Sequence, residues 1–134
     1  MSTHISASFT FDNWDEQEVL DRDGIRLVRT TFVKRFSGGL EGSSCGEMVM
    51  AHAQEGSAAY CGFELVQGCV EDRSGTFVLR HNAVMAAGVG SSDVEVMASS
   101  GTGGFAGLAG TANIDRHEDG SHTFTLDVAA FGDS

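Results

Sequence analysis

Three side chains of this sequence have the types and the spacing needed for acid–base chemistry: Tyr60, Glu64 and His81. Tyr60 and Glu64 share one face of an alternating stretch, His81 lies in the next, and a turn signal at Glu71–Gly75 separates the two stretches. If the stretches are antiparallel strands, this turn brings Glu64 and His81 close together on one face. A carboxylate and an imidazole in an apolar pocket have shifted pKa values, which acid–base catalysis requires. We therefore predict Glu64, His81 and Tyr60 as catalytic, with a structural Glu64–His81 hydrogen bond and simple packing of Tyr60 as the alternatives.

The elements that position these side chains are predicted from periodicity. Apolar and polar residues alternate with a period of two along most of the chain, whereas helical periodicity is nearly absent. Clusters of Gly, Asp and Ser separate the alternating stretches, as turns do. The expected strands, about eight, cover 5–11, 25–36, 40–52, 58–70, 75–84, 93–99, 105–115 and 122–131. Trp14–Leu20 is the one segment that can form a short helix, with Asn13 as its N-cap.

Sequential antiparallel strands must protect the edges of their sheet, and closure into a barrel removes those edges. We predict one all-β domain over 1–134: an eight-stranded antiparallel up-and-down β-barrel, calycin- or lipocalin-like, with at most one short helix. The absence of proline fits this prediction, because every strand of a closed barrel needs its N–H groups. An interior of eight strands is filled by side chains or holds one small ligand. A two-sheet sandwich is the alternative.

The apolar faces of the strands are expected to line the lumen. His122 shares a face with the apolar residues of the last strand, which predicts its position near one mouth of the barrel. Trp14 is expected to close one end or to form a wall for a ligand. The predicted ligand-binding residues are Phe9, Phe11, Trp14, Glu41, Phe77, Leu79, His122 and Phe124.

Composition excludes several classes of partner. The chain has 19 acidic and 8 basic residues, a net charge of −11, which argues against nucleic acid and anionic membrane surfaces. No apolar run has the ~18 residues of a membrane span, and the N-terminus lacks the pattern of a secretory signal. Cys45, Cys61 and Cys69 are odd in number and lack C-x-x-C spacing, so we expect reduced, buried thiols and a cytoplasmic location. No residue spacing predicts a metal site, and no motif predicts a cofactor.

Four segments resemble a known family: Phe32–Ser44, Tyr60–Gly68, Arg73–His81 and Ser100–Gly110. Together they resemble a bacterial domain-of-unknown-function family of allene oxide cyclase-like β-barrels, over about Ile5–Phe131. The resemblance implies an eight-stranded barrel with a cavity, assembled as a small homo-oligomer, a dimer or a trimer. More distant relatives of such barrels are plant allene oxide cyclases, dirigent proteins and spirotetronate cyclases, which bind an apolar reactive substrate and steer its folding.

The leading interpretation is a cofactor-free barrel that binds a small apolar or polyketide-like molecule and promotes its cyclisation or isomerisation. Catalysis would come mainly from holding a productive conformer, with Glu64, His81 and Tyr60 polarising a carbonyl or moving a proton. Two alternatives remain open: a non-catalytic barrel that carries a lipophilic ligand, and an oligomeric structural module with a filled lumen. The volume of the lumen distinguishes the ligand-binding interpretations from the structural one.

Overall fold

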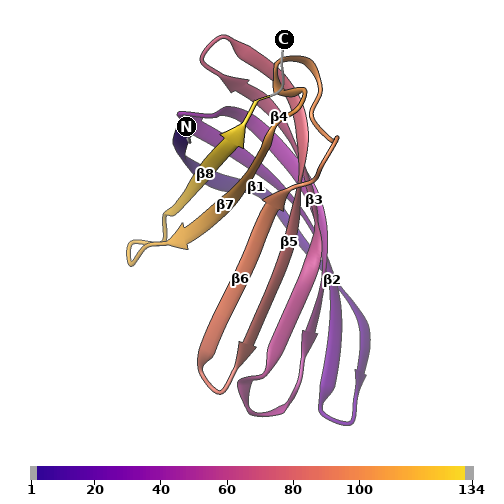
Figure 1. Cartoon of the computed structure of the whole chain (residues 1–134). Coiled ribbons are helices and arrows are strands. Elements are labelled where there is room, and N and C mark those ends of the chain that lie inside the picture. The colour runs from indigo at the N-terminus through magenta and orange to yellow at the C-terminus, as the bar shows by residue number, and fades with distance from the viewer. Residues whose placement is uncertain (1–2, 132–134) are drawn as a thin grey trace.

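The computed structural model describes residues 3–131, and the chain forms a closed antiparallel barrel with its eight strands in sequential order (Figure 1). This confirms the predicted all-β up-and-down barrel. The strands are β1 (Thr3–Arg22), β2 (Ile25–Gly38), β3 (Glu41–His52), β4 (Ala58–Val70), β5 (Arg73–Ala86), β6 (Val89–Val96), β7 (Ala109–Arg116) and β8 (His122–Ala130). Two 3-10 turns, η1 (Gln54–Gly56) and η2 (Gly103–Phe105), are the helical elements of the described residues.

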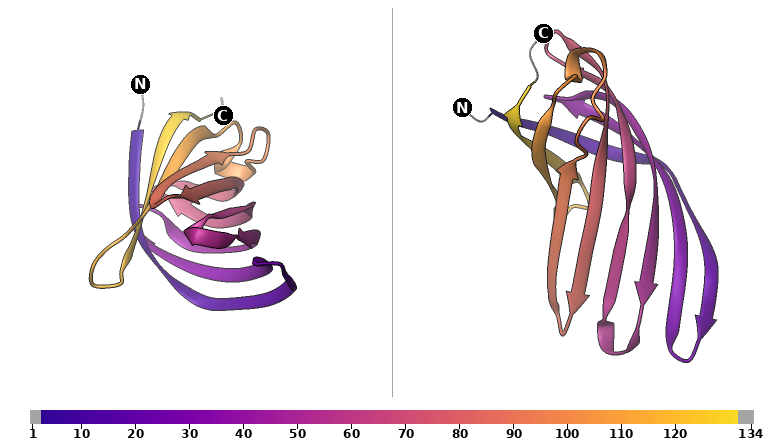
Figure 2. Two further views of the ribbon diagram at one scale, coloured as in Figure 1. Left: turned by 90° about the horizontal axis from the view of Figure 1, so that it is seen from below. Right: turned by 45° about the vertical axis from the view of Figure 1, so that its right-hand side comes forward.

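The barrel closes over only part of its length. β1 pairs with β8 from Thr3 to Phe9, and β6 pairs with β7 through Val94–Ala112 and Glu95–Thr111 alone. Because β7 and β8 are short, the far ends of β1–β6 extend beyond them as a curved sheet (Figures 1 and 2). The molecule therefore has a closed end and an open end.

Apolar side chains fill the closed end. Phe36, Phe77, Leu79 and Phe124 point inward from β2, β5 and β8 and are almost fully buried. The connection between β6 and β7 folds over this end and buries Phe105, whose ring meets that of Phe77 at 5.2 Å. Each such phenylalanine contributes about 1.5–3 kcal/mol relative to an exposed side chain. Side chains thus pack the interior of the closed end, and we expect a ligand to enter from the open end.

The prediction of a helix at Trp14–Leu20 is wrong. This segment continues β1, and its residues pair with β2 from Trp14–Phe32 to Glu18–Val28. An isolated helix of this length is marginal in water, whereas the strand gains ladder hydrogen bonds along its neighbour. One bulge just before the segment, between Phe11 and Asn13, and one within it, between Glu18 and Leu20, interrupt the alternation that would have indicated a strand.

Two further expectations need correction. The cysteines were expected to be buried, but Cys45 and Cys61 are exposed and Cys69 is half-buried. Cys45 and Cys61 are exposed because they lie on the outward faces of β3 and β4. The seventh strand begins at Ala109 rather than Phe105, since Phe105 belongs to η2 and packs into the core.

Candidate functional site

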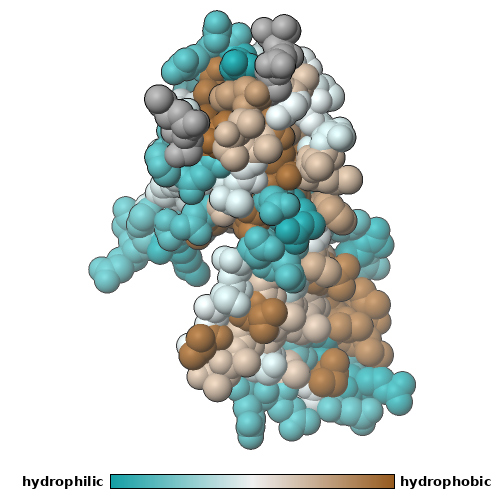
Figure 3. Space-filling view, viewed as in Figure 1, coloured by the Kyte–Doolittle hydropathy of each residue, from teal (hydrophilic) through white to brown (hydrophobic). Residues whose placement is uncertain are grey.

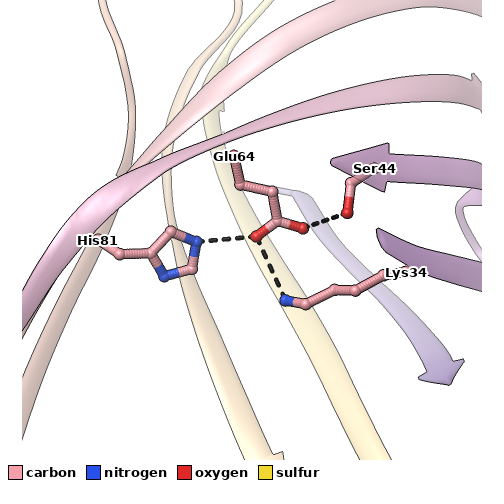
Figure 4. A network of polar contacts seen from close by, with 4 residues as sticks. All are labelled: Lys34, Ser44, Glu64 and His81. Atoms are coloured by element: carbon pink, nitrogen blue, oxygen red, sulfur yellow. Dashed lines mark hydrogen bonds and ion pairs between the residues drawn. The ribbon is translucent and has the colours of Figure 1, made fainter. Parts of the chain in front are cut away.

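Four polar side chains from four consecutive strands meet inside the barrel (Figure 4). Glu64 of β4 lies at their centre. Its Oε1 is 2.8 Å from His81 Nε2 of β5 and 3.2 Å from Lys34 Nζ of β2, and its Oε2 accepts a hydrogen bond of 2.5 Å from Ser44 Oγ of β3. All four residues are buried. The predicted proximity of Glu64 and His81 is therefore confirmed, and Lys34 and Ser44 complete the cluster.

Cross-strand register explains why these residues converge. Each of them faces inward on its strand, and their strands are adjacent in the sheet. Glu64 stands opposite Gly46, and His81 stands opposite Gly62. A Cβ at Gly46 would lie 2.5 Å from Cζ of Phe32. The glycine is therefore required for the ring of Phe32 to pass over β3 beside the cluster.

The contacts of Glu64 keep it ionised. Burial by itself would raise the pKa of the Glu64 carboxyl, but the hydrogen bond from His81, the charge of Lys34 and the hydrogen bond from Ser44 outweigh it and lower that pKa. Since a carboxylate only accepts hydrogen bonds, His81 Nε2 must carry the proton in their contact. When the ring is neutral, its other nitrogen, Nδ1, then has a free lone pair, and Nδ1 makes no hydrogen bond to any residue of 3–131.

Lys34 is the only lysine of the chain, and its side chain is 5% exposed. Its Nζ lies 4.4 Å from the centroid of the Phe9 ring and 5.2 Å from that of Phe32, in addition to its ion pair with Glu64. Burial lowers the pKa of Lys34, and the Glu64 carboxylate offsets part of that effect. The only lysine is thus a buried cation held between one carboxylate and aromatic faces.

A cavity of about 460 Å³ adjoins the polar cluster, in the range of small-molecule sites. Most of its wall is aromatic or methionine, and four basic side chains and Ile114 complete it. The residues lining this cavity are Phe9, Phe11, Trp14, Phe32, Lys34, Met48, Met50, Tyr60, His81, Ile114, Arg116 and His122. We call it the central cavity.

The aromatic part of the wall is built by contacts between rings. Phe9 stacks on His122 with 5.0 Å between centroids, and Trp14 lies nearly parallel to Phe32 at 6.2 Å. Phe11 stands edge-on to Trp14 at 5.1 Å. Rings that support one another in this way form a preorganised surface for a flat apolar ligand.

Several predicted site residues lie at the central cavity. Tyr60, Phe9, Phe11, Trp14 and His122 all line it. Burial raises the pKa of Tyr60, which keeps its hydroxyl protonated and able to donate a hydrogen bond. The catalytic and ligand-binding roles of these residues stay predictions.

Other predicted residues lie elsewhere. Phe77, Leu79 and Phe124 belong to the packed core of the closed end and do not line the central cavity. Glu41 is exposed near the start of β3, where its carboxylate accepts a hydrogen bond of 3.4 Å from the Gly38 amide. For Phe77, Leu79 and Phe124, alternation predicted the inward face but not the height along the barrel, whereas Glu41 lies on the outward face of its strand.

Sequence reasoning missed Ser44 of the polar cluster and six residues of the cavity wall: Phe32, Lys34, Met48, Met50, Ile114 and Arg116. The signal for Lys34 was present: it shares the inward face of β2 with Phe32 and Phe36. Arg116 had no such signal, because it stands next to a polar turn that looks entirely solvated.

Residues 3–131 contain no group of three or more His, Cys, Asp or Glu side chains arranged to hold a metal ion. Within the same residues, no helix is long and apolar enough to cross a membrane.

The protein is thus an antiparallel eight-stranded barrel with a buried ionic cluster beside a cavity lined mainly by aromatic and methionine side chains. The chain belongs to the family described as "Protein of unknown function (DUF3224)", which it matches over residues 5–128. A crystal structure of a DUF3224 protein of unknown function from Shewanella oneidensis MR-1 is similar, with 32% identity and a TM-score of 0.89 over 99% of this chain and 100% of that one. No curated protein matches the sequence. Membership of a domain-of-unknown-function family is confirmed, and the relationship to allene oxide cyclases stays a prediction.

Proposed function

We propose that this protein is a small-molecule-binding barrel that isomerises or cyclises an apolar substrate carrying a carbonyl group, without a cofactor. One observation carries the proposal: His81 donates Nε2–H to a buried carboxylate and keeps Nδ1 free, in the wall of an apolar cavity. A base oriented by a carboxylate is the arrangement that general-base catalysis uses.

In this mechanism His81 Nδ1 takes a proton from the carbon next to the carbonyl and later returns it at another carbon. Glu64 does not touch the substrate, so its role is positioning: it holds the ring and stabilises the imidazolium that forms. The Lys34 ammonium has N–H groups beyond the one used by Glu64 and stabilises the negative charge that develops on the carbonyl oxygen. Tyr60 provides a second donor for the same oxygen.

The aromatic wall provides the remaining part of the catalysis. A flexible substrate loses conformational freedom against Phe9, Phe11 and Trp14 before the reaction, which lowers the entropic part of the barrier. Cyclisation in particular requires two ends of one molecule to meet, and a cavity of about 460 Å³ restricts the conformers that a substrate can adopt.

Proton abstraction can be tested with a model ketone. We expect the protein to accelerate exchange of the α-protons of 2-naphthylacetone in D2O, followed by proton NMR. His81→Gln retains an N–H donor for Glu64 and removes the base, so exchange should fall by about 10²–10⁴-fold. His117→Gln changes a histidine in an exposed turn and is the matched control. Equal exchange by the wild type and a folded His81→Gln variant would show that His81 is not the base.

A second function, a carrier for a lipophilic ligand, is favoured by the predominance of aromatic and methionine side chains in the cavity wall. A carrier would bind 2-naphthylacetone and leave its α-protons unexchanged. A structural module with a filled lumen accords with the closed end but not with the central cavity.

We further infer that the barrel forms a homo-oligomer through its outer face. Val33, Cys45, Phe63, Leu65 and Val78 line a shallow apolar groove there, and Phe63 is 55% exposed. Figure 3 shows apolar surface over the lower strands. Glu47 and Arg80 stand beside Phe63 on the neighbouring strands, and each is paired with an opposite charge, Arg29 and Asp93, so a second copy would meet paired rather than free charges next to Phe63.

Light scattering on a size-exclusion column tests this inference. We expect the wild type to elute as a dimer or trimer, and Phe63→Glu to elute as a monomer because it places a charge in the apolar face. Val19→Glu, at an exposed apolar position elsewhere, should leave the oligomer intact. A monomeric wild type at high concentration would contradict the inference.

A further inference from the structure

The charge of the central cavity is opposite to that of the whole chain. Acidic residues outnumber basic ones by 19 to 8. The cavity wall nevertheless contains Lys34, His81, Arg116 and His122 and no acidic side chain. Glu64, behind the wall, is already engaged by Lys34 and His81. The cavity wall is therefore basic, although the chain as a whole is acidic.

Arg116 stands at the end of β7, directly across from His122 of β8. Six of the seven arginines of the chain have a polar partner: five form ion pairs with carboxylates, and Arg73 donates to the Gly104 carbonyl. Within residues 3–131, Arg116 is the arginine that has neither kind of partner. An arginine without a partner at the wall of a cavity is available for a ligand.

The pKa of His122 reflects the positive charges near the outer end of the cavity. Burial lowers the pKa of His122, and the charges of Arg116, Lys34 and His117 lower it further. The field that disfavours a proton on His122 also attracts an anion.

The exposure of the basic side chains differs between the two ends of the cavity. Lys34 and His81 are buried at its inner end, whereas Arg116 is exposed. Phe11 and Trp14 lie in the same wall and are 37% and 46% exposed. A large exposed aromatic surface next to a free cation suits a molecule with an apolar body and one charged end.

We propose that the ligand of the central cavity is an amphipathic anion, whose carboxylate or similar acidic group pairs with Arg116 and His122 while its apolar body packs on the aromatic wall. This names the substrate class for the proposed isomerase or cyclase and rests on the same cavity. It does not require His81 to act as a base. An anchored acidic group at the mouth would place the other end of the molecule toward Lys34 and His81.

The sole tryptophan, Trp14, lines the cavity, so its fluorescence reports binding directly. We would titrate the protein with 4-phenylbutanoate and with its neutral isostere 4-phenylbutanamide at low salt. The anion is expected to bind at least about tenfold more tightly, and the preference should shrink as salt is added. 4-Phenylbutylamine, the cationic analogue, should bind most weakly of the three.

Arg116→Gln is expected to abolish the preference for the anion and to leave the affinity for the amide unchanged. Arg35→Gln is the matched control, because Arg35 is exposed and pairs with Asp12 outside the cavity. As a second measurement, saturating 4-phenylbutanoate should raise the pKa of His122 in the wild type, followed by NMR.

Equal binding of acid and amide, a preference that survives in Arg116→Gln, or no binding of either probe would overturn the proposal. These outcomes are distinguishable from failure of the proposed catalysis. His81-dependent exchange of 2-naphthylacetone with no preference for anions would retain the catalytic proposal and reject the ligand class. Binding of the anion through Arg116 with no proton exchange would do the reverse.

Discussion

Glu64 Oε1 accepts a hydrogen bond from His81 Nε2 at 2.8 Å inside a barrel where both side chains are almost completely buried. The same oxygen is the partner of the only lysine of the chain. Burying a carboxylate costs desolvation energy, and once it is paired with two basic groups its removal strongly destabilises the fold. Both the stability of the barrel and the proposed chemistry therefore depend on it.

Removal of the charge of Glu64 should destabilise the protein strongly. Glu64→Gln leaves Lys34 buried without a counter-ion, and we expect a loss of about 3–5 kcal/mol in the free energy of unfolding, measured by urea denaturation. Glu47→Gln removes an exposed partner of Arg29 and should change stability little. The double variant Lys34→Met/Glu64→Gln should recover much of the loss, because no unpaired charge remains buried. A single variant as stable as the wild type would contradict this account.

The contribution of Glu64 should depend on pH. Its carboxyl has a lower pKa in the folded protein than the ordinary 4.5, so the unfolded chain binds more protons as the solution is acidified. The stability that Glu64 provides is therefore fully present above about pH 4.5 and is lost as pH falls through the folded-state value. In urea denaturation at several pH values, the wild type and Glu64→Gln should differ most near neutral pH and converge in acid. A difference in stability between the two proteins that stays constant down to acid pH would contradict an ionised Glu64 as the source of this stability.

The two ends of the barrel should respond differently to truncation. Phe77→Ala creates a void in the packed closed end and should cost about 3–5 kcal/mol of stability. Phe11→Ala should cost much less, since Phe11 is 37% exposed, and should instead weaken binding of 4-phenylbutanoate. Denaturation curves and Trp14 fluorescence separate the two effects. Comparable losses of stability in both variants would mean that Phe11 belongs to the core.

The exposed cysteines provide a probe of the outer face. In a monomer, Cys45 and Cys61 should react with Ellman's reagent rapidly and Cys69 more slowly, because Cys69 is half-buried. If the outer face joins two copies, raising the protein concentration should slow Cys45 and Cys61 in the wild type but not in Phe63→Glu. Rates independent of concentration in both proteins would count against an interface at this face.

Much of this architecture could be predicted from local patterns. Alternation and turn signals define the strands, and they predicted that Glu64 and His81 would meet, because antiparallel strands joined by a short turn are necessarily neighbours. Lys34 was missed although it alternates with Phe32 and Phe36. Burial of a charged side chain cannot be expected before its counter-ion is known, and the counter-ion of Lys34 lies 30 positions further along the chain.

The sequence by itself determined the type of most elements and the face on which most side chains lie, because both follow from the dihedral preferences and the period of a strand. Only the tertiary structure decided that Trp14–Leu20 is strand, because a neighbouring strand satisfies its backbone. Only closure decided that Phe77 lies in the packed end and Phe9 at the cavity, since periodicity has no information on depth. Closure also brought Arg116, 82 positions along the chain from Lys34, to the same cavity wall. Contacts between distant segments depend on how the sheet curls, and that is a property of the whole chain.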